Sequence, residues 1–99
     1  MDNLLKIGIE QETIDKMIEV NDIFLVEELD EKHLNTLKII NTLRELKIDK
    51  ENIDLMLINY IDIFLMDYDS FVNKLKDVDL NDFSNMINND LEAAYDIFF

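Results

Sequence analysis

The chain offers few side chains whose types and spacing suit catalysis or metal binding. It contains no cysteine, which excludes disulfides, thiolate metal sites and thiol nucleophiles. His33 is the only histidine, and a metal site there would have to recruit carboxylates alone. A histidine-activated nucleophile would have to be Ser70 or Ser84, and neither serine lies in a recognisable catalytic motif. We therefore expect a protein that is not an enzyme and uses no cofactor.

One stretch has part of the pattern of a calcium-binding loop. Asp77, Asp79 and Asn81 carry oxygen ligands at alternate positions, as the start of an EF-hand loop does. That loop also requires a glycine for its sharp turn and, near its end, a glutamate that binds through both oxygens. This sequence has Asp82 and Asn88 at those two positions. We interpret the cluster as helix capping and solvated surface, and we expect no metal site.

An acidic run near the end of the first third of the chain is another candidate for chemistry. It consists of Glu27, Glu28, Asp30 and Glu31. Acid–base catalysis by paired carboxylates requires that burial keep one of them protonated near neutral pH. The neighbouring residues do not indicate such burial. We interpret the run as a solvated helix face and a helix start.

Negative charge is concentrated toward the end of a chain whose formal net charge is −14. The last basic residue is Lys76, and the acids beyond it are Asp77, Asp79, Asp82, Asp90, Glu92 and Asp96. Such a field repels phosphate backbones and attracts basic partners. The alternative explanation is that a large net charge simply keeps a small protein dispersed. If a partner binds here, we expect it to contact Asp79, Asp82, Asp90 and Asp96.

The elements that must position these side chains are predicted to be helices. The chain has no proline and a single glycine, Gly8, so the tight turns of β-hairpins have little support. Short polar residues that cap helix N-termini are frequent instead, and we expect this role for Asp30, Asp49, Asn81 and Asp90. The sequence therefore predicts an all-α fold.

Apolar residues recur about every three to four positions, which is the spacing of one helix face. The longest such segment covers residues 31–46, where Leu37, Ile40, Leu43 and Leu46 repeat. Shorter segments carry Ile14, Met17 and Ile18, then Ile53, Met56, Leu57 and Tyr60, then Phe71, Val72 and Leu75, then Phe83, Met86 and Ile87, and finally Leu91, Ala94, Tyr95 and Phe98. We predict one domain, residues 1–99, folded as a compact bundle of about six or seven short helices.

Apolar residues are in surplus in one stretch and at the C-terminus. The stretch contains Leu55, Ile58, Ile61, Ile63, Phe64, Leu65 and Met66, which cannot all face one core. The favoured explanation is a central helix and its continuation that are packed on all sides. The alternatives are a docking surface for another protein and a homodimer contact. In either alternative we expect Phe64, Met66, Phe98 and Phe99 to contact the partner.

The sequence gives no support for export or for a membrane-spanning segment. The N-terminus, Met1-Asp2-Asn3, lacks the basic and apolar regions of a signal peptide. The most apolar run, Ile53 to Met66, is too short to cross a bilayer and contains Asp54 and Asp62. We expect a cytoplasmic protein.

Two segments of the chain match when Ile9 is placed over Ile48. In this register the paired residues are Glu12 with Glu51, Ile14-Asp15 with Ile53-Asp54, and Met17 with Met56. One additional residue in the second copy brings 22–25 over 62–65, and both segments read Asp-Ile-Phe-Leu. A third, shorter match covers 78–89, where Phe83 and Met86 stand like Ile53 and Met56. We expect helix–turn–helix repeats, with units at about 4–42 and 43–77 and a partial unit at 78–99.

The paired segments have features of a known repeat over roughly residues 4–65. Residues 4–9, Leu-Leu-Lys-Ile-Gly-Ile, give a leucine-bearing helix end and a turn, Ile14 with Met17-Ile18 gives a helix, and Phe24-Leu25 closes the unit. The counterparts in the second copy are 43–48, Ile53, Met56-Leu57 and Phe64-Leu65. This pattern resembles the repeat of the mitochondrial transcription termination factor (mTERF) family. The resemblance implies stacked helix–turn–helix units and, in that family, nucleic-acid binding along a concave face.

The chain departs from the mTERF pattern in two respects. Asp22 and Asp62 stand where the family has proline, and the chain is acidic whereas the family is basic. The nearest basic stripe is Lys38, Arg44 and Lys47, which do not fall on one helix face. We expect these residues to pair with neighbouring acids such as Glu45 and Asp49.

These observations favour an interaction module over an enzyme. We expect a small acidic protein that binds a protein partner, in particular a basic one, as an adaptor, regulator or inhibitor. A more specific version is a mimic of DNA, whose carboxylates occupy the basic groove of a nucleic-acid-binding protein. The alternative function is nucleic-acid binding by the mTERF-like repeats themselves.

Overall fold

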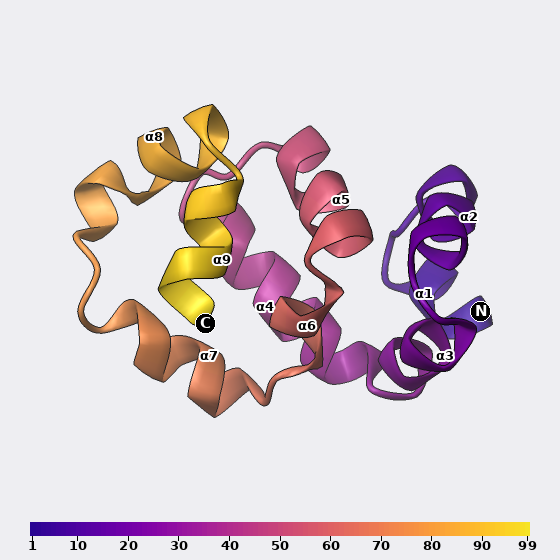
Figure 1. Ribbon diagram of the computed structural model, residues 1–99. Coiled ribbons are helices and arrows are strands. Elements are labelled where there is room, and N and C mark those ends of the chain that lie inside the picture. The colour runs from indigo at the N-terminus through magenta and orange to yellow at the C-terminus, as the bar shows by residue number, and fades with distance from the viewer.

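A computed structural model describes all residues, 1–99, and contains helices joined by short turns and no strand (Figure 1). The nine helices, in chain order, are α1 (Asp2–Lys6), α2 (Gln11–Val20), α3 (Ile23–Glu31), α4 (His33–Glu45), α5 (Lys50–Asn59), α6 (Ile61–Leu65), α7 (Tyr68–Leu75), α8 (Leu80–Asn89) and α9 (Glu92–Phe98). The molecule measures 35 × 25 × 21 Å. The predicted all-α, compact fold is confirmed.

The helix count of six or seven was an underestimate, because two helices are very short. α1 and α6 have 5 residues each. One and a half turns hold too few apolar positions to reveal a helical period in the sequence. α4, the longest helix at 13 residues, was predicted from the repeat of its apolar face, although it begins at His33 and not at residue 31.

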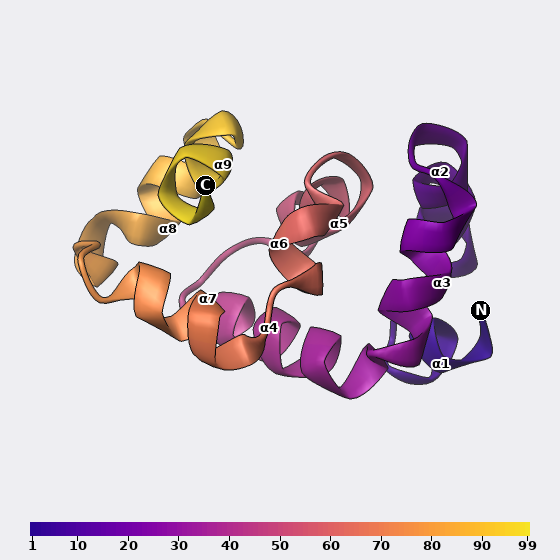
Figure 2. The same ribbon diagram turned by 60° about the horizontal axis from the view of Figure 1, so that its bottom comes forward.

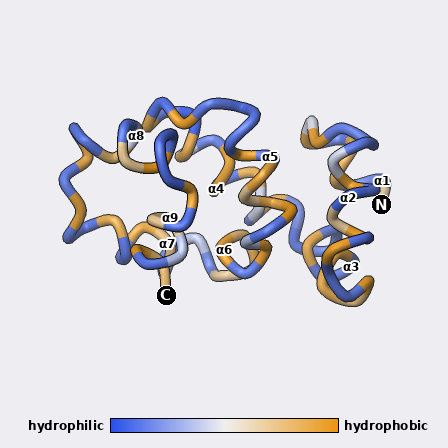
Figure 3. Tube along the Cα trace, turned by 45° about the horizontal axis from the view of Figure 1, so that its top comes forward, coloured by the Kyte–Doolittle hydropathy of each residue, from blue (hydrophilic) through white to orange (hydrophobic).

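The helices form three neighbouring groups. Figure 2 shows α2 with α3 on the right, α5 with α6 in the middle and α8 with α9 on the left, while α4 and α7 run beneath them. A cluster of 23 buried apolar residues fills the interior, and every helix contributes to it. Apolar and polar stretches alternate along the chain, as Figure 3 shows, because each helix buries one face and exposes the other.

The apolar surplus between residues 55 and 66 is mainly core. The backbone turns sharply at Tyr60, which has φ −133° and ψ 49° and separates α5 from α6. The two helices consequently point different faces into the interior, and Ile58, Ile61 and Ile63 are all buried. The favoured explanation, an element packed on all sides, is therefore correct for most of this stretch. Leu55 is the exception, with 41% of its surface exposed.

The capping predictions were partly wrong. Asp30 does not start a helix; its carboxylate accepts a hydrogen bond of 3.1 Å from the backbone N–H of Leu4 and so joins α3 to α1. Asp79 and not Asn81 caps α8, by accepting from the Asn81 N–H at 3.0 Å. Asp49 occupies the cap position of α5 but makes no side-chain cap bond, and Asp90 accepts from the Glu92 N–H at 3.1 Å.

Three asparagine side chains tie neighbouring groups of helices together. The Asn21 amide donates to the carbonyl of Ile58 at 2.8 Å and links α2 to α5. The Asn35 amide donates to the carbonyl of Met66 at 2.8 Å and its oxygen accepts from the Tyr68 N–H at 2.9 Å, which fixes the α6–α7 turn on α4. Asn88 on α8 accepts from the Asp49 N–H and donates to the Lys47 carbonyl, each at 3.2 Å.

The ends of α1 and α4 form the same turn. The N–H of Ile9 donates to the carbonyl of Leu4, and the N–H of Ile48 donates to that of Leu43, both at 3.1 Å. Within the turns that these hydrogen bonds close, Gly8 has φ 98° and Lys47 has φ 68°. This left-handed helix ending suits glycine, which has no Cβ, and strains lysine.

Replacing Lys47 with glycine is expected to raise the free energy of unfolding by about 0.5–1 kcal/mol. The left-handed conformation costs a residue with a Cβ about 1–2 kcal/mol, and the greater freedom of glycine in the unfolded chain offsets part of the gain. The opposite change, Gly8→Ala, should lower the free energy of unfolding by about 1 kcal/mol through conformation alone, since no atom lies within 4 Å of the place its Cβ would take. Urea denaturation measures the change in the free energy of unfolding for each variant. A Lys47→Gly protein that is less stable than the native one would contradict strain at Lys47.

Candidate partner-binding surface

Helices α8 and α9 bring the predicted acidic residues together on one pair of packed helices. Asp79 and Asp82 lie at the start of α8, Asp90 lies between the two helices, and Asp96 lies on α9. All four side chains are exposed. Asp79 also caps α8, and Asp90 accepts a hydrogen bond from the Glu92 N–H at the start of α9, so these two carboxylates have a structural role as well.

The apolar residues expected to contact a partner are mostly unavailable to one. Phe64 and Phe98 are buried, and Phe98 stacks on Phe71 with ring centroids 4.8 Å apart. Their positions on α6 and α9 point into the shared core, so neither side chain is accessible to a partner in this fold. Met66 is partly buried and packs against that core. Only Phe99 is accessible, with 55% of its surface exposed.

A hollow of about 280 Å³ lies where α9 meets the junction of α5 and α6. Tyr60, Glu92, Tyr95 and Asp96 line it. The ring centroids of Tyr60 and Tyr95 are 6.0 Å apart and the rings are tilted by 41°, and the ring centroid of Phe99 lies 5.0 Å from that of Tyr95. The surface therefore combines aromatic faces with two carboxylates.

The sequence analysis did not identify this hollow. It placed Tyr60 and Tyr95 on core-facing helix sides, whereas 49% of the Tyr95 surface is exposed. A signal was present in part, because Glu92 and Asp96, like Tyr95 and Phe99, stand four residues apart and so share a face of α9. Tyr60 gave no such signal, since only the tertiary packing brings it beside α9.

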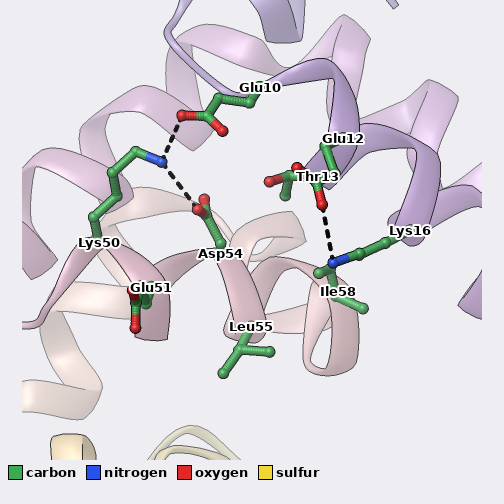
Figure 4. A pocket seen from close by; sticks show the side chains of 9 residues that line it. All are labelled: Glu10, Glu12, Thr13, Lys16, Lys50, Glu51, Asp54, Leu55 and Ile58. Carbon is green, nitrogen blue, oxygen red and sulfur yellow. Dashed lines mark hydrogen bonds and ion pairs between the residues drawn. The ribbon is translucent and has the colours of Figure 1, made fainter.

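A second hollow, of about 510 Å³, separates α2 from α5 (Figure 4). Lys50 lies in it between two carboxylates, with its Nζ 2.9 Å from Glu10 and 3.1 Å from Asp54. On the opposite wall Lys16 pairs with Glu12 at 3.5 Å. Figure 4 shows Lys50 of α5 reaching Glu10 at the start of α2, whereas Lys16 and Glu12 pair with each other on α2. The two lysines thus compensate half of the negative charge of the four acids that line the groove, Glu10, Glu12, Glu51 and Asp54.

The ion pairs divide the chain into two electrostatic parts. The complete set comprises Lys16–Glu12, Lys32–Glu28, Lys50–Glu10 and Lys50–Asp54. No carboxylate after Asp54 has a basic partner within 4.0 Å. The acids of α8 and α9, which include both carboxylates of the aromatic hollow, consequently carry their charge uncompensated.

The local pairs expected around α4 do not form. Lys38, Arg44 and Lys47 make no ion pair with Glu45, Asp49 or any other acid. Lys38 instead extends over the ring of Tyr68, with its Nζ 6.0 Å from the ring centroid. The predicted pairing of these basic residues with Glu45 and Asp49 is therefore wrong.

The remaining candidates for chemistry lie apart from one another. His33 hydrogen-bonds through Nδ1 to the carbonyl of Asp30 at 3.1 Å. Its ring therefore stabilises the junction between α3 and α4. No three side chains among histidines, aspartates and glutamates gather closely enough to hold a metal ion. None of the helices has both the length and the apolar character that a bilayer crossing needs.

Loss of the Lys50 cation is expected to destabilise the fold in a pH-dependent manner. The hydrogen bonds that the Lys50 ammonium donates to Glu10 and to Asp54 raise the pKa of Lys50 above its ordinary value of 10.5. Because the folded state holds the proton more tightly, the stabilisation is complete below 10.5 and is lost as pH rises through the folded-state pKa. The stability difference between the native protein and Lys50→Met should therefore be present at neutral pH and shrink in alkali.

The matched control for this prediction is Lys74→Met, because Lys74 is exposed and unpaired. Thermal unfolding at a series of pH values measures both variants against the native protein. Identical pH profiles for the two variants would show that Lys50 acts only through the overall charge and not through Glu10 and Asp54.

Comparisons with known protein families, with curated proteins and with solved structures find no match to this chain. The charge, exposure and geometry of the chain itself are therefore the basis for a functional proposal.

Proposed function

We propose that the chain is a non-catalytic module that docks on a basic surface of a partner protein through α8 and α9. The observation that carries the proposal is the uncompensated charge of this helix pair. Its acids are exposed, no basic residue follows Lys76, and no ion pair occurs beyond Asp54. The module would act as an adaptor, regulator or inhibitor.

The free state of these carboxylates favours binding to a cationic surface. An acid that is already paired must give up its partner before it can bind another cation, whereas an unpaired one keeps its full field. Unpaired charges of one sign also steer an oppositely charged partner during diffusion and raise its association rate. The α2–α5 groove lacks this property, since Lys16 and Lys50 occupy its acids.

Mimicry of DNA is the more specific form of this proposal. In that form the carboxylates of α8 and α9 take the place of phosphates in the basic groove of a nucleic-acid-binding protein. Asp79, Asp82, Asp90 and Asp96 all lie on the surface of one helix pair, which supports such a role.

We further propose that the nine helices are three stacked units of mTERF-like architecture. The shared left-handed turns at Gly8 and Lys47 support it, as do the buried pairs Ile14 with Ile53 and Met17 with Met56. The grouping of α2–α3, α5–α6 and α8–α9 in Figure 2 agrees with three units.

The similarity between the proposed units has limits. Phe24 and Phe64 match in sequence, yet 72% of the Phe24 surface is exposed while Phe64 is buried. In the third unit Phe83 is buried as expected, but Met86 is 39% exposed and Ile87 takes the core position. The turn before α8 also lacks a left-handed residue.

The alternative function, nucleic-acid binding, is favoured by one observation. Lys38, Arg44 and Lys47 are exposed and have no acidic partner, so they are available to phosphate groups. Against it stands the net charge of −14, which repels a phosphate backbone.

Neutralising the α8–α9 acids is expected to abolish partner binding while leaving the fold intact. The variant replaces Asp79, Asp82, Asp90 and Asp96 with asparagine, which caps helices as well as aspartate does and so preserves the caps at Asp79 and Asp90. We expect capture of the partner from an extract of the native cell, quantified by mass spectrometry, to fall by about tenfold or more because steering and contact charge are both lost.

A control variant of the same net charge isolates the position of the acids from their number. It replaces the exposed, unpaired residues Glu19, Glu27, Glu31 and Glu45 with glutamine. This variant should retain partner capture. An equal loss in both variants, or no loss in the asparagine variant, would refute docking through α8 and α9.

Retention on immobilised nucleic acid distinguishes the two proposed functions. At low salt we expect the native protein to pass through columns of duplex DNA and of RNA without delay, because its field repels phosphate. Salt-sensitive retention that disappears in the triple variant Lys38→Gln, Arg44→Gln, Lys47→Gln would instead establish the alternative.

A further inference from the structure

We propose that the hollow lined by Tyr60, Tyr95, Glu92 and Asp96 binds an arginine side chain of the partner. The inference rests on the proposed function, since it identifies which group of a basic partner this face recognises. It adds a specific site, made of aromatic rings, to a surface so far defined by charge alone.

The aromatic walls of the hollow suit a flat cation. Tyr60 and Tyr95 are tilted by 41° with centroids 6.0 Å apart, so their faces form an open angle and do not cover each other. Phe99 packs beside Tyr95, with the two ring centroids 5.0 Å apart. A cation over such a ring face is attracted by the negative charge density of the π-system.

The two carboxylates complete the chemistry of the site. Glu92 and Asp96 lie one helical turn apart on the same side of α9 and both line the hollow. Neither has a basic partner within the chain. A cation held against the tyrosine rings would therefore be neutralised by acids that are otherwise unpaired.

The polar ends of the tyrosines are also free. Of the three tyrosine hydroxyls, that of Tyr68 is the one hydrogen-bonded within the chain, to Thr42 at 2.8 Å. The hydroxyls of Tyr60 and Tyr95 remain available as acceptors. Tyr95 is 49% exposed, and Tyr60 is half-buried against the core.

Arginine fits this combination better than lysine does. Its guanidinium is planar, stacks on aromatic faces and directs several N–H donors in its own plane, whereas a lysine ammonium is compact and strongly hydrated. A guanidinium lying on Tyr95 can direct its N–H groups toward Glu92 and Asp96 at the rim. A volume of about 280 Å³ is ample for one side-chain head and small for a folded segment.

Two peptides of equal charge, hexa-arginine and hexa-lysine, test the proposal on the full chain. Binding is measured at low salt by nuclear magnetic resonance, with the ring signals of Tyr60 and Tyr95 as local reporters. We expect hexa-arginine to bind about two- to fivefold more tightly than hexa-lysine, the factor that a cation–π contact at an exposed site supplies. We also expect hexa-arginine to shift both ring signals.

Three variants locate the preference. Tyr95→Leu should remove the preference for arginine while the affinity for hexa-lysine stays the same, and Tyr95→Phe should keep the preference because the ring remains. Phe24→Leu, a change at an exposed aromatic residue on α3, should leave the affinity for each peptide unchanged. The spectra themselves report whether each variant is folded. The ring-signal test uses the native protein, so it holds even if a variant does not fold.

The possible outcomes separate this inference from the broader proposal. Equal affinity for the two peptides, or ring signals of Tyr60 and Tyr95 that do not move with hexa-arginine, would overturn the arginine site. Docking through α8 and α9 would survive that result if the asparagine variant still bound both peptides more weakly. Failure of the native protein to bind either peptide at low salt would overturn both.

Discussion

Burial of apolar faces in one shared core is the constraint on which the rest of this structure depends. The longest helix has 13 residues and two have 5, and helices of this length are marginal or unstable alone in water. Each helix therefore forms only because it buries a stripe of side chains against the others, in a cluster of 23 residues. Asn21, Asn35 and Asn88 add hydrogen bonds between groups that the core has already brought together.

The shared core also decides which residues remain for recognition. Phe64 and Phe98 are needed in the interior, so carboxylates, asparagines and a few exposed apolar side chains remain on the surface of α8 and α9. No basic residue pairs with these acids, since the ion pairs all lie at or before Asp54. Uncompensated charge on one helix pair is the physical basis for the proposed docking on a basic partner.

The α2–α5 groove and the hollow beside α9 illustrate how similar residue types give different chemistry. Both combine acids with neighbouring side chains of other kinds. In the α2–α5 groove Lys50 is held by Glu10 and Asp54, so that the charges stabilise the contact between two helices. At the C-terminal hollow the acids Glu92 and Asp96 face aromatic rings and no cation, so that an external cation can complete the site. The difference lies in whether the fold supplies the opposite charge.

The sequence by itself determined the helical class, the compact core and the acidic character of the C-terminal segment, because these depend on composition and on local spacing. It also indicated the matching turns before α2 and α5, since a leucine-bearing helix end followed by an isoleucine recurs there. Only the tertiary structure decided that α5 and α6 are separate helices, that Phe64 and Phe98 are buried, and that Tyr60 meets Tyr95. These features depend on how helices distant in sequence pack against one another, and a local apolar pattern is the same whether a given face meets the core, another helix or water.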